Sequence, residues 1–194
     1  MTKVFANMAF TQGDTILTGS DGLAELMLDE DKEVTISSNT HLEFTELVTS
    51  IEAAEGKSLL NLFEGKVKVK ITEKLKGDSR FQIATPNAIM GVMCTEFYVY
   101  TDENGTWVGV IEGEVEVINQ QGERITVVPG NKSVFIGNDG SVIEEELDDE
   151  MIERFSSYVQ NEPEQDQVQV TVDNSGRLEE DDEEDEEADD EPEE

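Results

Sequence analysis

A two-residue alternation of apolar and polar side chains is the feature that most constrains how this chain can fold. The alternation recurs in short runs from Thr15 to about Ile143. Successive side chains of a β-strand point to opposite faces, so each run predicts a strand with one buried face. The runs are separated by turn dipeptides: Asp21-Gly22, Asn104-Gly105, Gln121-Gly122 and Asp139-Gly140. Many short strands joined by tight turns predict an all-β domain, built as a sandwich, a barrel or a solenoid.

An internal similarity favours the solenoid among these architectures. The segment LLNLFEGKVKVKI, from Leu59 to Ile71, resembles WVGVIEGEVEVIN, from Trp107 to Asn119, and Gly65 matches Gly113. We expect both glycines to turn the chain sharply at equivalent points, because glycine admits backbone angles closed to other residues. If the two segments stack as neighbouring rungs, the outward lysines of the first face the outward glutamates of the second in a charge ladder. That ladder comprises Lys66, Lys68 and Lys70 opposite Glu114 and Glu116.

The segment FQIATPNAIMGVMCTEFYVYT, from Phe81 to Thr101, is almost uncharged in a strongly acidic chain. Pro86 fixes its own φ and lacks an amide donor, which suits a corner. Gly91 is expected to allow a close approach of the backbone. We predict that the segment is packed inside the β structure, with Val92, Phe97 and Val99 in the core.

The periodicity changes after the strands, and it divides the chain into four parts. Apolar residues at helical spacing predict an amphipathic helix over residues 146–160 that caps the β domain of residues 1–145, on one of its ends or faces. The apolar stripe of this helix could instead be a partner-binding surface. The helical stripe comprises Met151, Ile152, Phe155, Tyr158 and Val159. Residues 161–178 are predicted to be a linker with one short strand. Residues 179–194 hold 14 acids and no base, and we predict a disordered acidic tail.

The charge balance excludes some classes of partner. The chain carries 47 acidic and 13 basic residues, for a formal net charge of −34, which disfavours nucleic acid and anionic lipid surfaces. One segment, from Lys57 to Arg80, is locally basic. Its bases are either a solvated face paired to glutamates, or a patch that receives the acidic tail or an anionic surface polymer. The patch comprises Lys66, Lys68, Lys70, Lys74, Lys76 and Arg80.

The side chains that usually carry chemistry are scarce or isolated. His41 is the single histidine and has no second histidine with which to complete a metal site. Cys94 is the single cysteine, which excludes an internal disulfide, and we expect it in the core as a small hydrophobe. The sequence contains no nucleophile elbow, phosphate loop or His-Glu-x-x-His motif. We therefore expect no enzyme activity, no cofactor and no structural metal.

The order of these segments resembles the FecR-type domain, named for the ferric-citrate regulator, over roughly Gly13 to Gly140. The most specific element is a Thr-Pro, Ala, Gly-Val, Thr, Phe pattern: Thr85, Pro86, Ala88, Gly91, Val92, Thr95 and Phe97. Where the family usually carries Arg-Gly, this chain has Met93-Cys94. The resemblance implies a β-rich, solenoid-like domain that lies outside the cytoplasm and has no enzymatic activity. In iron-uptake regulators such a domain is the outer part of a membrane-bound anti-sigma protein.

These observations lead to three functional hypotheses. The first is a non-catalytic scaffold or sensor outside the cytoplasm that recognises another protein or an anionic surface polymer. The second is the signalling ectodomain of an anti-sigma-type transmembrane regulator. The third is an acidic surface protein that binds divalent cations weakly, calcium among them. The sequence shows neither a bilayer-spanning apolar stretch nor a signal peptide, so we expect either a cytoplasmic protein or a fragment of a longer one.

Overall fold

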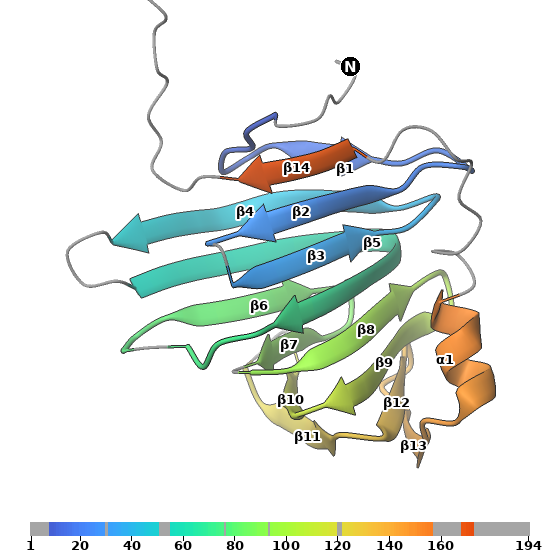
Figure 1. Cartoon of the computed structure of the whole chain (residues 1–194). Helices are drawn as coiled ribbons and strands as arrows, with labels where there is room; N and C mark the ends of the chain where they lie inside the picture. Colours follow the sequence, from blue (N-terminus) through green and yellow to red (C-terminus); the bar gives the residue numbers. More distant parts are fainter. Residues whose placement is uncertain are drawn as a thin grey trace, which may run out of the picture.

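The computed structural model describes residues 8–29, 31–50, 55–75, 77–92, 94–119, 122–156 and 168–172. These residues form an all-β domain with one helix, drawn in Figure 1. The elements are β1 Thr15–Leu17, β2 Ala24–Leu28, β3 Lys32–Ile36, β4 His41–Ser50, β5 Glu55–Ile71, β6 Arg80–Ala84, β7 Ile89–Val92, β8 Glu96–Thr101, β9 Gly105–Glu112, β10 Glu114–Ile118, β11 Arg124–Pro129, β12 Lys132–Gly137, β13 Val142–Glu146, α1 Asp149–Ser156 and β14 Val168–Val172.

The strands form one 14-stranded sheet that curls around the long strand β5 (Figure 1). The first part of β5 pairs with β4 and β6, and its second part, from Gly65, pairs with β3 and β8. We call the two parts of the sheet half A, in the order β1-β4-β5-β6-β7-β10-β11, and half B, in the order β14-β2-β3-β5-β8-β9-β12-β13. Because β5 belongs to both halves, they curve toward each other around one core.

The core lies between the inner faces of the two halves. Alternate residues of the strands are buried, as in β2, where Ala24, Leu26 and Leu28 are buried and the intervening residues are not. Buried residues from both halves belong to one hydrophobic cluster, including Phe44, Phe81 and Phe97. Each large apolar side chain buried in this way stabilises the fold by about 1.5–3 kcal/mol. The predicted all-β class is confirmed.

The strands do not stack as solenoid rungs. Consecutive strands such as β8 and β9, or β12 and β13, pair antiparallel as hairpins, and parallel pairing occurs only between β5 and β6 and between β14 and β2 among the described strands. The predicted charge ladder is also wrong, because the lysines of β5 lie in half B and the glutamates of β10 lie in half A. An alternating pattern states which face of a strand is buried, but it does not state which strand lies alongside.

The internal similarity nevertheless marks two equivalent corners. Gly65 and Gly113 have φ angles of 101° and 84°, and each lies where the chain crosses from one half of the sheet to the other. At each corner a threonine hydroxyl donates to the carbonyl of the residue that follows the glycine: Thr40 to Lys66 O at 3.3 Å, and Thr95 to Glu114 O at 3.2 Å. The prediction of sharp turns at these two glycines is confirmed.

The helix α1 lies on the outer face of half B. Met151 and Ile152 pack there against a small cluster built on Tyr98 and Leu147. The helix begins after Asp148, whose carboxylate accepts a hydrogen bond from the Met151 amide at 2.8 Å. The helix therefore docks on a sheet face, which is one of the two predicted placements, and it does not close an end of the sheet.

The remaining predictions for the C-terminal region are tested only in part. Residues 157–160 of the predicted helix and the acidic tail, 179–194, lie outside the described residues. The short strand predicted within 161–178 is β14, which pairs parallel with β2 at the edge of half B. The described part of the chain contains no helix with the length and apolar character that a bilayer crossing requires.

Candidate functional site

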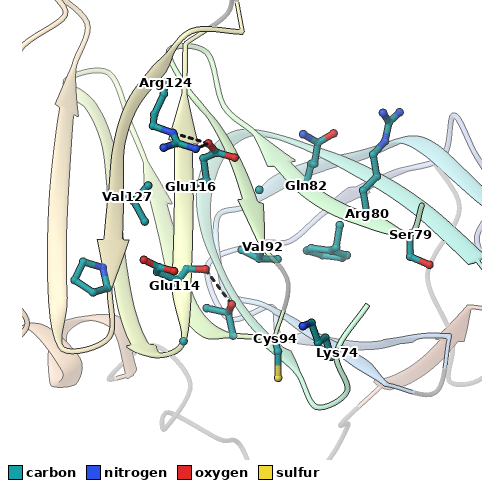
Figure 2. A pocket seen from close by; sticks show the side chains of 15 residues that line it. Lys74, Ser79, Arg80, Gln82, Val92, Cys94, Glu114, Glu116, Arg124 and Val127 are labelled. Atoms are coloured by element: carbon teal, nitrogen blue, oxygen red, sulfur yellow. Dashed lines mark hydrogen bonds and ion pairs between the residues drawn. The ribbon is translucent and has the colours of Figure 1, made fainter. Parts of the chain in front are cut away.

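An open groove of about 940 Å³ crosses the outer face of half A, over β6, β7, β10 and β11 (Figure 2). Loops and strand ends close it at one side, where the β5–β6 connection, the β7–β8 loop and the Gly113 corner meet. The lining residues are Lys74, Ser79, Arg80, Phe81, Gln82, Gly91, Val92, Cys94, Thr95, Gly113, Glu114, Glu116, Arg124, Val127 and Pro129. This groove is our candidate site.

Gly91 creates a notch in the middle of the groove. The strand registers place Gln82, Gly91, Glu116 and Val127 side by side in one row across β6, β7, β10 and β11. A Cβ atom added at Gly91 would meet no atom within 4 Å, and its φ is not in the left-handed region. The backbone here does not require glycine, and no neighbour approaches it closely. The predicted close approach of the backbone is wrong, because the missing side chain leaves space that is open to solvent.

Ion pairs occupy the two rims of the groove. On one rim the Arg124 guanidinium bonds to the Glu116 carboxylate at 2.6 and 2.7 Å, as Figure 2 shows. Next to the other rim, the Arg80 guanidinium bonds to Glu46 at 2.6 Å. The side chains of Arg124 and Arg80 are 66% and 51% exposed, and such exposed pairs stabilise a fold by at most about 1 kcal/mol each. A partner that offers its own acceptors can therefore displace them at small cost.

The β7–β8 loop forms the closed end of the groove. Cys94 lies here and is exposed, so the prediction that it is a core residue is wrong. It lies between the end of β7 at Val92 and the start of β8 at Glu96, so the burial alternation of the strands does not extend to it. Its Sγ lies 3.7 Å from the Ile71 carbonyl oxygen.

The remaining residues of the Thr-Pro pattern hold the β6–β7 hairpin in place. Pro86 is exposed at the turn, whereas Ala88, Val92 and Phe97 are buried as predicted. The buried Thr85 hydroxyl accepts from the Ala88 amide at 3.2 Å and lies 2.9 Å from the Thr106 hydroxyl of half B. A short network of buried polar groups continues the link from this turn to half B: Thr106 Oγ1 to Asn87 Oδ1 at 2.6 Å, Asn87 Nδ2 to Ile136 O at 2.6 Å, and Thr101 Oγ1 to Thr106 Oγ1 at 3.1 Å.

The basic patch is divided between two faces of the domain. Lys74 and Arg80 line the groove on half A, while Lys66, Lys68 and Lys70 lie on the outer face of half B; Lys76 lies outside the described residues. Lys66 lies over the Tyr100 ring at 4.9 Å, and Lys68 bonds to Glu96 at 2.7 Å.

The environment of Lys68 stabilises its charged form. Burial acts to lower the pKa of Lys68, but the hydrogen bond to Glu96 and the interactions with Tyr98 and Glu96 outweigh it, so the pKa lies above its usual value. Lys68 is therefore a charge partner within the sheet.

The other candidates for chemistry do not join the groove. His41, on β4, packs against Phe63 with the ring centroids 4.7 Å apart and the rings tilted by 41°, and it does not line the groove. Among the residues that the structure describes, His, Cys, Asp and Glu side chains form no group of three that could hold a metal ion. The groove presents amide, carboxylate, guanidinium, amine, hydroxyl, thiol and apolar groups.

Sequence reasoning missed one side of the groove entirely. Glu116, Arg124 and Val127 come from β10 and β11, and their place beside Gly91 depends on the pairing of β10 with β7. Because that pairing joins strands far apart in sequence, a periodicity signal cannot reveal it. The Gln121-Gly122 dipeptide between β10 and β11 is the available clue in the sequence, and it predicts only that these two strands form a hairpin.

Comparisons with known proteins agree with this fold. Two crystal structures of a candidate anti-sigma factor from Parabacteroides distasonis, at 2.50 Å and 1.65 Å resolution, each resemble this chain with a TM-score of 0.60 and 18% sequence identity. The similarity covers 76% of this chain and 65% of the other, just under two thirds of its length, and at this identity it shows the fold alone. A search of curated proteins found no match.

The sequence also matches a family model. The model, described as FecR protein, matches residues 14–116, from just before β1 into β10. The matched segment includes the Thr-Pro pattern and the β6–β7 hairpin, and it ends before β11. Because it covers more than half of the chain, this protein belongs to the FecR family.

Proposed function

We propose that this chain is the recognition domain of a signalling regulator and that it binds a protein segment in the groove over β6, β7, β10 and β11. The observation that carries the proposal is the notch at Gly91, where the strand conformation does not need glycine and a Cβ would have free space. A partner side chain that enters this notch contacts Gln82 and Glu116 on either side. The domain acts by binding and not by covalent chemistry.

The charges of the groove favour a protein segment over an anionic polymer. Lys74, Arg80 and Arg124 line it together with Glu114 and Glu116, so the groove is nearly balanced in charge although the chain is strongly acidic. A polyanion is best bound by an uninterrupted row of bases. Here the bases are divided between two faces, and Lys68 already bonds to Glu96. A protein segment with mixed polar and acidic groups matches this lining better.

The signalling role and the location outside the cytoplasm rest on family membership and on the fold shared with the candidate anti-sigma factor. In such a regulator, binding of a partner to the outer domain changes the activity of a distant effector, so the groove is an input site. We place the chain outside the cytoplasm on the same grounds. Weak calcium binding by the acidic tail is a separate proposal, since carboxylate oxygens are the ligands that Ca²⁺ prefers.

The groove can be tested by filling it. Gly91→Phe places an aromatic ring in free space on a strand, and the variant should fold as well as the natural chain. The matched control is Glu33→Phe, which adds the same ring on an exposed strand position of the outer face of half B. Each variant is placed in the full-length gene, and transcript levels are measured across the whole genome. They should change with Gly91→Phe as they do when the gene is deleted, and should stay normal with Glu33→Phe. Normal transcription with a folded Gly91→Phe protein contradicts the proposal.

A further inference from the structure

The strand β13 forms an open edge of half B. Of the strands that the structure describes, only β12 pairs with β13. The Gly137 amide donates to Ser141 O, and the Leu147 amide donates to Asn131 O, so in this register the odd-numbered residues bond to β12. The backbone N–H and C=O groups of Val142, Glu144 and Glu146 therefore point away from the sheet. Such an edge is a template for a further strand.

Apolar side chains lead to this edge and are exposed on it. Tyr100, Trp107, Phe135 and Ile143 lie side by side in one row across β8, β9, β12 and β13. The Tyr100 and Trp107 rings stack at 5.1 Å, and the Trp107 and Phe135 rings lie 4.3 Å apart. The row ends at Ile143, which is 49% exposed, and the adjacent Val142, on the opposite face of β13, is 42% exposed. Tyr100 and Trp107 are partly buried beside the Tyr98–Leu147 cluster on which α1 packs, so the apolar surface that a partner can reach is at Val142 and Ile143.

The charge of the edge selects the partner. Six exposed acids lie on β13 and just after it: Glu144, Glu145, Glu146, Asp148, Asp149 and Glu150. Lys132, which contacts Glu146, is the basic residue on the neighbouring strand. Pairing of two copies of β13 would bring these acids together in two chains of charge −34 each, which disfavours self-association. A strand with basic residues is the complement.

The fold itself contains a basic strand that pairs with acidic neighbours. In β5, lysine alternates with valine over Lys66–Lys70, and β5 lies between β3 and β8, which present Glu33 and Glu96 to it. The Lys68–Glu96 bond at 2.7 Å joins two of these strands directly. We propose that β13 is a docking edge for an extended segment of another protein in which basic and apolar residues alternate, added as a further strand to half B.

The probe for this proposal is a capped peptide with the sequence of residues Lys66–Ile71, and the control peptide has glutamate in place of its three lysines. We expect the basic peptide to bind the full chain, with slower hydrogen exchange at the amides of Val142, Glu144 and Glu146, and the acidic peptide not to bind. Affinity should fall as salt rises, because the charges are exposed. Binding of both peptides, or protection that maps elsewhere, would overturn the proposal.

Two variants test the edge itself. Glu144→Pro removes an outward N–H that β12 does not use and blocks the approach of a strand, so binding should weaken by roughly tenfold or more. Glu144→Gln removes only the charge and should weaken binding by a factor of roughly 2 to 5, as expected for one exposed ion pair. The acidic tail is present in every variant and in the natural chain, so any attraction of the tail for the peptide does not affect the comparison of their affinities. Equal binding by Glu144→Pro and the natural chain would refute the docking edge.

A further variant and a second measurement cover the remaining outcomes. If Glu144→Pro unfolds, Ile143→Lys, at a half-exposed position, keeps the strand and should repel the basic peptide to a similar extent. Sedimentation velocity of the natural chain should show a monomer. A dimer that is lost in either variant would show that a second copy occupies the edge, which would overturn the basic partner. The Gly91→Phe variant should bind the peptide normally, so the edge and the groove are tested independently.

Discussion

Two glycines that line the groove should respond in opposite ways to the same substitution. At Gly91 the backbone is in an ordinary strand conformation and an added Cβ would meet nothing within 4 Å. At Gly113 φ is 84°, and an added Cβ would collide with the Cys94 carbonyl oxygen and lie 3.1 Å from Thr95. We therefore expect Gly91→Ala to stabilise the fold and Gly113→Ala to destabilise it.

The magnitudes follow from these two environments. Replacing a glycine whose conformation suits alanine restricts the unfolded chain and stabilises by about 0.4–1 kcal/mol. At Gly113 the left-handed backbone costs alanine roughly 1–2 kcal/mol. The collision is with backbone atoms, which cannot rotate away, so the total cost should be about 2–4 kcal/mol. The two variants should thus differ in their free energy of unfolding by roughly 2–5 kcal/mol.

Urea unfolding followed by circular dichroism measures this difference. With an m-value of about 2 kcal/mol per molar urea, the middle of the usual range, the midpoint should rise slightly for Gly91→Ala and fall by roughly 1–2 M for Gly113→Ala, with m unchanged. A destabilised Gly91→Ala variant would refute the reasoning, because it would mean that the strand needs glycine at this position. The notch would then be a by-product of the fold and no longer an argument for a binding site.

Three further substitutions test the buried network and the charges. Thr106→Val removes a hydroxyl within hydrogen-bond reach of Asn87 and should destabilise by about 1–3 kcal/mol in the same urea assay, whereas an unchanged midpoint would mean that the network contributes nothing. The pKa of Lys68 is higher in the folded chain than in the unfolded chain. Its charge therefore contributes fully to stability at a pH below the pKa of the unfolded chain, and this contribution is lost as pH rises through the pKa of the folded chain. Lys68→Met should flatten the loss of stability above about pH 10. Burial acts to raise the pKa of Asp102, but hydrogen bonds outweigh it and lower the pKa. The contribution of the Asp102 carboxylate to stability is therefore lost as pH falls through its pKa in the folded chain. Asp102→Asn should reduce the acid sensitivity of thermal unfolding below about pH 4.

The sequence predicted the strands and their buried faces well, because both depend on local patterns. The alternation of Val67, Val69 and Ile71 with lysines places each residue on the correct face. The corners at Gly65 and Gly113 could also be predicted, since a repeated Glu-Gly pair marks a backbone need that only glycine meets cheaply.

The pairing of the strands could not be predicted in the same way. The two similar segments suggested stacked rungs, but in the fold β8 lies between β5 and β9, and β10 joins the other half of the sheet. A solenoid and a curled antiparallel sheet have the same two-residue period, so only long-range contacts distinguish them. Cys94 was misplaced for a related reason: the apolar character of its neighbours extends past the end of β7, and the burial does not.

The surroundings of the notch indicate how the groove would recognise the proposed partner. Gly91 lies on the β6–β7 hairpin, whose turn is tied to half B through Thr85 and Thr106, and the Gly113 corner fixes the closed end of the groove. Both anchors are backbone or buried contacts, whereas the groups that can move are the exposed arginines of the rims. A partner therefore meets a preformed notch and has to rearrange only surface side chains, which keeps the entropic cost of binding low. The strands of the groove should therefore keep their positions on binding. A signal from this domain would then depend on which exposed side chains the bound partner covers, and on which ion pairs it displaces, at the rims.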